Sequence, residues 1–262
     1  MANAPAAGHA LAILTLLARH ATPVAAASIA RELELPRSTT YHLLTVLVEQ
    51  GYAVHLPEER RYGLGVAAFE LGSAYTRQAP LQRLARPRLQ RLADAAGHNA
   101  HLAVLHGSDV LYVIEERVAG RPSLVTDVGV RLPATLTASG LAVLAASSPA
   151  QVRALYPSAS TFVQRHGVGP ASLVELRRVL TATRARGYAV EDGLVTPGLA
   201  SVASAVLDHS GHPVAGLAVT FPTDQRGVRD GDGAGTSPPE ELVAQVAGCA
   251  AELSARLGHR GG

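Results

Sequence analysis

Residues 24–65, which read VAAASIARELELPRSTTYHLLTVLVEQGYAVHLPEERRYGLG, decide the fold of the first quarter of the chain. Their apolar spacing predicts a helix near 26–33 and, after a turn at 34–36, a second helix that runs to about Gln50. Pro36 suits the first position of that second helix, because proline has no backbone N–H to lose there. The glycine that follows Gln50 is typical of a helix end.

A hairpin and an earlier helix complete this module. Residues 52–55 and 61–64 are predicted strands on either side of a tip at 57–59. A further helix is predicted over 10–18, where leucines recur at helical spacing. Helices in this order, followed by a hairpin, are typical of a winged helix-turn-helix, which lays one helix in the DNA major groove. The sequence therefore predicts a DNA-binding module over residues 1–65.

The outward face of the predicted recognition helix is polar and rich in hydrogen-bond donors. Its inward face holds Thr40, Leu43, Leu44, Leu47 and Val48, and its outward face holds Arg37, Ser38, Thr39, Tyr41, His42 and Thr45. Arg37 can bind guanine or a phosphate through two parallel hydrogen bonds. Ser38 and Thr39 can hold a phosphate together with the backbone N–H groups of the helix start. On the hairpin, Arg60 and Arg61 are expected to contact the flanking phosphates.

Composition excludes several classes of protein. The chain has 262 residues, of which 47% are hydrophobic and 17% charged, so it is not a disordered chain and can hold one or two domains. No run of 18 apolar residues occurs, and no membrane span is expected. The N-terminal stretch lacks the basic region of a signal peptide, and the single Cys249 cannot form an internal disulfide. We therefore expect a cytoplasmic protein that does not bind a membrane.

Charge is distributed in an unusual way for a DNA-binding module. The net charge is only +2, and residues 1–79 carry six arginines against six glutamates. A run of arginines without an intervening acid follows over 77–91. Formal neutrality counts against strong non-specific affinity for DNA. It does not count against groove binding, which depends on the charges of one face.

The rest of the chain alternates helices and strands. Residues 66–96 have a helical pattern interrupted near 79–80, and leucines at 81, 84, 89 and 92 form a stripe suited to another subunit or to the second domain. Strands are predicted over 101–106, 110–115, 124–130, 188–191, 200–207 and 214–221, helices over 136–146, 173–186 and 240–257, and a loop over 226–239. The tight hairpins favour an α+β domain with an antiparallel sheet.

Several stretches, in order along the chain, resemble the isocitrate lyase regulator (IclR) family of bacterial transcription factors. They are LPRSTTYHLLTVLVEQGYAV with RYGLG, RLPATLTASGLAVLA, RGYAVEDGLVTPGLASVASAVLD, and VAGLAVTFP. The resemblance covers about residues 10–255. It implies a winged helix-turn-helix over 1–65, a linker helix over 66–80, and a GAF-like α/β effector-binding domain over 81–258. It also implies a dimer, or a tetramer made of two dimers, in which a small molecule changes operator binding.

The resemblance implies where that effector binds. Backbone N–H groups of Ala138, Ser139 and Gly140, at the start of a helix, would hold its carboxylate. The chemistry is reasonable in itself, because the N-terminus of a helix attracts anions. An acidic pocket position maps to Glu191 or to its neighbour Asp192, and we prefer Glu191.

Three further positions map to the same pocket. Leu199 would be an apolar contact and Thr220 a hydroxyl contact, while Ser201 stands where the family commonly has cysteine. Ala218 occupies a position where a second hydroxyl is often found. Because two polar groups are altered, a less polar or larger effector than those of characterised relatives is expected.

Other chemistries find little support in the sequence. His101 and His106 would lie on opposite faces of a strand, and no cysteine lies near, so a metal site is not expected. The glycine-rich run at 231–235 lacks the residues of a phosphate or calcium loop. No nucleophile elbow surrounds Ser139. We expect no catalytic residue, no metal and no cofactor.

The leading prediction is a ligand-responsive transcriptional regulator, with repression favoured. It would bind a pseudo-palindromic DNA operator and respond to a carboxylate or aromatic metabolite. An activator of the same architecture stays open. The weaker alternatives are an enzyme that converts a small acid near Ser139, Glu191, Ser201 and Thr220, and an adaptor that uses the winged helix to bind protein. Salt-dependent DNA affinity separates a regulator from an adaptor.

Overall fold

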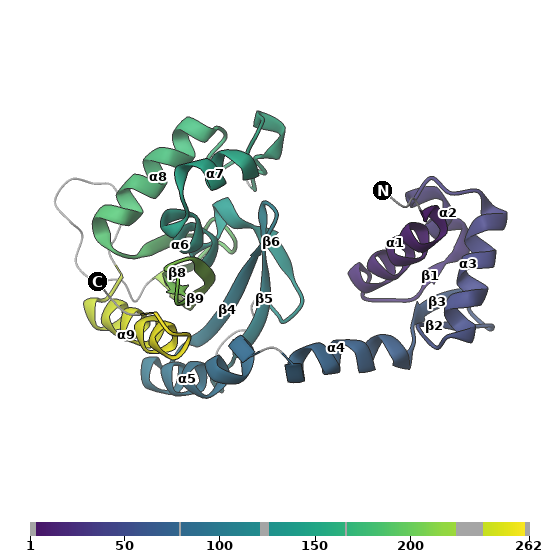
Figure 1. The fold of residues 1–262 in the computed structure, drawn as a ribbon, viewed down its shortest axis with the longest axis horizontal. Helices are drawn as coiled ribbons and strands as arrows, with labels where there is room; N and C mark the ends of the chain where they lie inside the picture. The colour runs from purple at the N-terminus through teal and green to yellow at the C-terminus, as the bar shows by residue number, and fades with distance from the viewer. Residues whose placement is uncertain (1–3, 79, 121–125, 166, 224–237, 260–262) are drawn as a thin grey trace. The chain divides into compact units, whose positions relative to one another are not determined.

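The computed structural model describes residues 4–78, 80–120, 126–165, 167–223 and 238–259. The chain divides into two compact units, Met1–Ala79 and Pro80–Gly262. Figure 1 labels most of their helices and strands. Among the described residues, no helix has both the length and the apolar character that crossing a membrane requires.

The first unit has the predicted order of helices and hairpin. Its elements are α1 (Pro5–Arg19), β1 (Val24–Ala25), α2 (Ala26–Glu32), α3 (Arg37–Glu49), β2 (Ala53–Leu56), β3 (Arg61–Leu64) and α4 (Val66–Gln78). Ile13, Ile29 and Leu44 come from α1, α2 and α3 and have no exposed surface, so the three helices share one core. The winged helix-turn-helix is therefore confirmed.

Details of this unit differ from the sequence prediction. α1 begins at Pro5, five residues earlier than predicted. Pro36 lies just outside α3 rather than at its first position, with an extended backbone whose carbonyl accepts from Thr40 N–H at 3.0 Å. β1 was not predicted, since two residues are too short to show a period. It pairs with β3 and gives a three-stranded sheet in the order β1-β3-β2.

The second unit is a six-stranded antiparallel sheet between two layers of helices. Its elements are α5 (Pro80–Ala96), β4 (Asn99–His106), β5 (Asp109–Glu116), β6 (Arg131–Pro133), α6 (Ala138–Ala146), α7 (Pro149–Leu155), α8 (Leu173–Arg186), β7 (Ala189–Asp192), β8 (Leu199–Leu207), β9 (Pro213–Pro222) and α9 (Glu240–Arg256), with 3-10 turns at Ala134–Leu136 and Ala159–Thr161. The strand order is β6-β5-β4-β9-β8-β7. This confirms the predicted antiparallel α+β domain.

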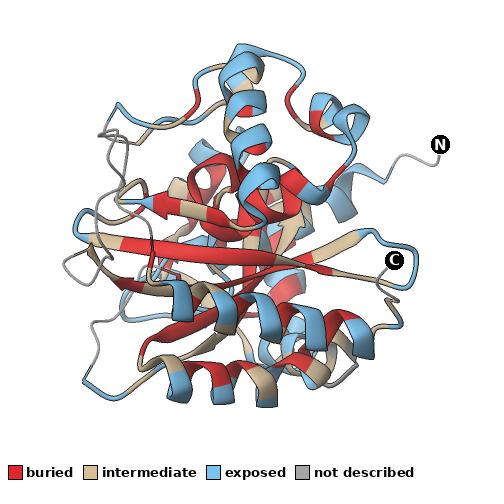
Figure 2. Cartoon of the chain, turned by 90° about the vertical axis from the view of Figure 1, so that its left-hand side faces the viewer, coloured by how far each residue is buried: buried red, intermediate tan, exposed pale blue. Residues whose placement is uncertain are grey.

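The two helical layers bury different faces of the sheet. α5 and α9 cover one face, where Leu89, Val246 and Leu217 belong to the same core. The leucine stripe of α5 therefore packs on its own unit, one of the two alternatives left open by the sequence. The other face carries α6, with α8 outside it, and Figure 2 shows the buried sheet between the layers.

Helix α6 is buried almost completely, and this places its first turn against the sheet. Eight of its nine residues are buried, as expected for a helix that is apolar on all sides. A Cβ at Gly216 of β9 would overlap the backbone of Ser139, and one at Gly140 would overlap that of Ala134. Both glycines are therefore required for the close approach of α6 to its surroundings.

The second unit differs from the sequence prediction at two segments, residues 126–130 and helix α7. The strand expected at 124–130 is wrong over Thr126–Val130, because Val130 N–H donates to the Asp127 carbonyl and Gly129 has a left-handed φ of 88°. Residues 124 and 125 lie outside the described residues, as do residues 226–237 of the predicted loop. Helix α7 was missed, although Ser148 and Gln151 form a capping box that marks its start.

Candidate functional site

The first candidate site is the outer face of α3. Its exposed side chains are Arg37, Ser38, Tyr41, His42 and Thr45, and Thr39 is half-buried. Within this fully described segment, α3 has neither a side-chain cap nor an acidic residue in its first turn. The helix start can therefore accept a phosphate. The Thr45 hydroxyl donates to the Tyr41 carbonyl at 3.0 Å, so this hydroxyl presents an acceptor rather than a donor to its surroundings.

The wing places Arg60 and Arg61 differently. Arg60 is exposed at the tip and has a left-handed backbone with φ 53°. Nη1 of Arg61 donates to the Pro23 carbonyl at 3.0 Å, which ties β3 to the segment before α2. Burial, and then the proximity of Tyr41, raise the pKa of Tyr62 on the same strand. The Tyr62 ring stacks on that of His55 in β2, with 4.6 Å between the ring centroids, while Arg60 stays exposed at the tip of the wing.

The second candidate site is a pocket on the face of the sheet that α6 covers. Of the effector residues predicted from the sequence, the pocket is lined by Ala138, Ser139, Glu191, Leu199, Ser201 and Thr220. Segments far apart in sequence, from the start of α6 to strand β9, therefore meet at one cavity.

Sheet register explains why this cavity exists. Glu191, Ser201 and Thr220 are paired neighbours on β7, β8 and β9, so they form one polar row across the sheet. The next row on the same face contains Ala203 and Ala218, whose small side chains leave space above the sheet. The polar row becomes one wall of the cavity, and of the two alanines only Ala218 lines it.

The polar row is joined by hydrogen bonds. The Ser201 hydroxyl donates to Oε1 of Glu191 at 2.8 Å and lies 2.9 Å from the Thr220 hydroxyl. When Glu191 is ionised, Ser201 gives its single proton to the carboxylate, and Thr220 is then the donor in the second bond. Oε2 of Glu191 accepts from Leu194 N–H at 3.2 Å.

Glu191 is a carboxyl group with an altered proton affinity. Burial raises its pKa to about 7, against the opposing effect of the hydrogen bonds from Ser201, Leu194 and Val195. Near neutral pH the group can therefore take either protonation state. Its neighbour Asp192 is exposed and does not line the pocket, so the structure places Glu191, not Asp192, at this position.

The start of α6 forms the opposite wall. Thr137 precedes the helix, and its hydroxyl accepts from Gly140 N–H at 3.1 Å. Gly140 itself does not line the pocket. In the part of the chain that the structure describes, the N–H groups of Ala138 and Ser139 make no hydrogen bond. These two groups are available to an anion, and the positive end of the helix dipole favours one.

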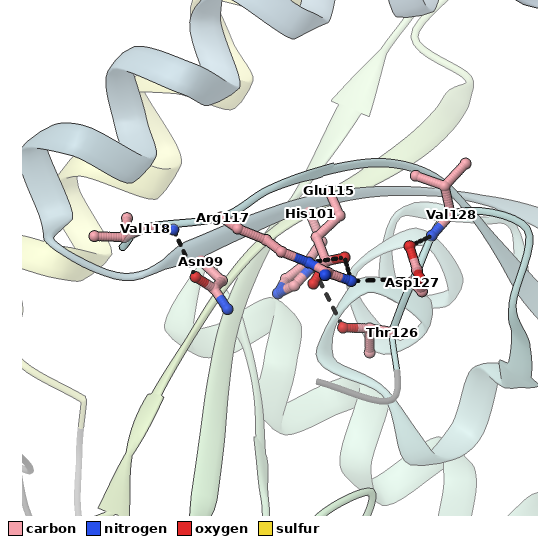
Figure 3. A network of polar contacts seen from close by, with 8 residues as sticks. All are labelled: Asn99, His101, Glu115, Arg117, Val118, Thr126, Asp127 and Val128. Atoms are coloured by element: carbon pink, nitrogen blue, oxygen red, sulfur yellow. Dashed lines mark hydrogen bonds and ion pairs between the residues drawn. The ribbon is translucent and has the colours of Figure 1, made fainter. Parts of the chain in front are cut away.

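A third wall was not predicted from the sequence. It contains His101, Tyr112 and Thr126, from β4, β5 and the segment before β6. Figure 3 shows the polar network behind it, in which Arg117 bonds Glu115 at 2.7 Å and Asp127 at 3.4 Å. The alternation of β4 could have signalled that His101 faces inward, but the partners of that strand cannot be read from the sequence.

Comparisons with known proteins cover both units. The model for the IclR helix-turn-helix domain matches residues 6–57, and that for the bacterial transcriptional regulator IclR C-terminal domain matches residues 73–255. The glycerol operon regulatory protein of Streptomyces coelicolor is 32% identical, covering 95% of this chain and 94% of that protein. The transcriptional repressor IclR of Escherichia coli is 30% identical, covering 86% of each. A solved IclR transcriptional regulator from Alicyclobacillus acidocaldarius has a TM-score of 0.80 at 24% identity, covering 98% of this chain and 100% of that chain.

Proposed function

This chain belongs to the IclR family of bacterial transcriptional regulators, and on that premise we propose which of its residues bind DNA and which bind the effector. The family consists of ligand-responsive DNA-binding regulators. Residues 1–65 would bind the operator, residues 66–80 would form the linker, and residues 81–258 would bind the effector. Repression is favoured, because one of the relatives is named a repressor.

The proposed DNA contacts follow from exposure on α3 and the wing. Arg37, with five donors, would read a guanine or grip a phosphate, and Tyr41, His42 and Thr45 would face the base edges. Ser38 and Thr39 would hold a phosphate at the uncapped helix start. Arg60 would contact a flanking phosphate. Nη1 of Arg61 is bonded to the Pro23 carbonyl, so Arg61 would contact a phosphate through its other N–H groups.

The proposed effector is a small molecule with a carboxylate. Its carboxylate would accept from Ala138 and Ser139 N–H, while Glu191, Ser201 and Thr220 would contact its other polar atoms and Leu199 its apolar part. Gly140 would act indirectly, by letting α6 approach its surroundings closely. The observation that carries this proposal is the meeting of a free helix start and a hydrogen-bonded polar row in one pocket.

An assembly of two or four copies would let two winged helices bind a pseudo-palindromic operator. Half-sites would then be separated by about one helical turn of DNA or a small multiple of it. Such a regulator would work in the cytoplasm, where bacterial DNA is found.

Selection of DNA by the full chain from a random library, repeated across a salt series, tests this function. A regulator should enrich a two-fold symmetric sequence, and its affinity should fall steeply with salt because counterions are released from the phosphates. An Arg37→Ala variant should enrich a sequence that is degenerate at one position of each half-site. Failure of the folded chain to enrich any sequence would contradict the proposal and favour the protein-binding adaptor.

A further inference from the structure

His101 lines the effector pocket, and its buried Nε2 atom has no hydrogen-bond partner among the described residues. The side chain is 1% exposed and lines the pocket. Its Nδ1 lies 3.4 Å from the Thr126 hydroxyl, whereas Nε2 has no hydrogen-bond partner among the described residues. A buried polar atom without a partner is costly, which makes such an atom uncommon in a finished core.

The side chains of the polar row differ from His101, because they already have hydrogen-bond partners within the pocket. Glu191, Ser201 and Thr220 already bond one another. Ser139 Oγ makes no hydrogen bond of good geometry, but it lies at the helix start beside the two N–H groups that favour an anion. Nε2 of His101 belongs to a different wall of the pocket. His101 lies on β4, the strand next to β9, where it pairs with Ala218.

The imidazole of His101 is neutral. Burial, and then the positive charge of Arg117, lower the pKa of His101 to about 3. Glu115, its paired neighbour on β5, is bound to Arg117, and Asp127 bonds the same guanidinium. The Tyr112 ring meets the imidazole edge-on, with 5.9 Å between ring centroids. A neutral imidazole adds no positive charge that would attract a carboxylate away from the helix start.

A neutral imidazole presents at Nε2 either a donor or an acceptor, depending on its tautomer. The Thr126 hydroxyl can serve either tautomer, because it can accept from Nδ1 or donate to it. The group that best satisfies Nε2 is therefore one that can also do both, and a hydroxyl has this property.

We propose that His101 is a specificity-determining residue, which selects a hydroxylated carboxylic acid by bonding the hydroxyl through Nε2 while the helix start binds the carboxylate. This inference rests on the proposed effector pocket. It narrows the effector from carboxylates in general to hydroxy acids. Both groups lie near Ala218, because the helix start packs on β9 at Gly216 and His101 pairs with Ala218 of the same strand.

Matched pairs of acids that differ by one hydroxyl test the proposal. The probes are lactate with propionate, 3-hydroxybutyrate with butyrate, mandelate with phenylacetate, and 4-hydroxybenzoate with benzoate, each titrated calorimetrically into the full chain. We expect at least one hydroxy acid to bind about tenfold more tightly than its partner. His101→Leu should abolish this preference, because leucine has no polar atom to bond the hydroxyl.

A second histidine provides the matched control. His98 is also buried, but its ring lies near Phe221 in the core on the opposite face of the sheet. His98→Leu should lower the stability without changing the preference for the hydroxyl, and His101→Gln should retain part of that preference. A preference that persists in His101→Leu would overturn the proposal, as would an equal loss of affinity for both members of a pair.

The proposal and the function on which it rests can fail separately. If the chain binds its selected DNA but none of the hydroxy acids, or binds the unsubstituted acids better, the role of His101 is wrong and the DNA-binding function stands. If a hydroxy acid binds through His101 but leaves the DNA affinity unchanged, the role of His101 in selecting the acid is supported. The proposal that the acid regulates DNA binding is then wrong.

Discussion

Ser201 donates a hydrogen bond of 2.8 Å to Glu191, and this bond joins strand β8 to the edge strand β7 inside the pocket. The resemblance to the family places a cysteine where this chain has Ser201. A hydroxyl is a stronger donor than a thiol, so the serine holds the carboxyl of Glu191 more firmly than a cysteine would. The same hydroxyl accepts from Thr220, and the three side chains act as one polar unit.

The protonation of Glu191 should appear in the pH dependence of stability. Burial raises its pKa from 4.5 to about 7, so between these values the native carboxyl keeps a proton that the unfolded chain releases. Glu191 therefore makes the wild type less stable as the pH rises through this window. Relative to the wild type, Glu191→Gln should gain roughly 3 kcal/mol in free energy of unfolding between pH 4.5 and pH 8. Urea unfolding at both pH values measures this gain, and a difference independent of pH would contradict it.

The contact between Gly216 and the start of α6 should be sensitive to a single methyl group. In Gly216→Ala the new Cβ would overlap the Ser139 backbone, so we expect a loss of about 1–3 kcal/mol in stability together with weaker binding of carboxylates. Gly248→Ala is the control, because Gly248 lies in the exposed part of α9 with nothing within 4 Å of its added Cβ. That variant should gain roughly 0.5–1 kcal/mol from helix propensity. Equal effects of the two substitutions on thermal unfolding would rule out a close contact at Gly216.

Arg37 should contribute to sequence recognition rather than to general affinity. Arg37→Ala should cost about 1–3 kcal/mol on the preferred operator and relax the choice of base at one position of each half-site. Binding isotherms on operators with each of the four bases at that position measure the effect. If every operator is weakened by the same factor, Arg37 contacts a phosphate and not a base.

Arg60 should contribute affinity without specificity. Replacing it with alanine should weaken all operators by a similar factor and reduce the slope of log affinity against log salt by about 1. Arg60→Gly separates DNA binding from folding, because glycine adopts the left-handed φ of 53° without steric cost. The glycine variant should lose the same DNA affinity with no loss of thermal stability, and an unchanged salt slope would exclude a phosphate contact.

Much of the fold could be predicted from the sequence because its long elements have clear periods. The helix of residues 173–186 was predicted with its observed limits, since apolar spacing and the following Gly187 mark it. Short elements could not be found in this way. β1 and β6, with two and three residues, show no period and exist only through pairing with β3 and β5.

The pocket was harder to predict than the fold. Its residues on α6, β7, β8 and β9 came from the resemblance, and its wall on β4 was missed. His101 reaches the pocket through its pairing with Ala218, a residue 117 positions further along the chain. Register between strands so distant in sequence is set by tertiary packing. It could not be predicted from the composition of the chain.

A regulator of this kind requires reciprocal coupling between the pocket and the operator. The dissociation constant of the full chain for its selected operator should be measured with and without a saturating carboxylic acid that binds the pocket. We expect the acid to change this dissociation constant by about fivefold or more. The operator should change the affinity for the acid by the same factor. If an acid binds the pocket and leaves the operator affinity unchanged, the pocket does not regulate DNA binding.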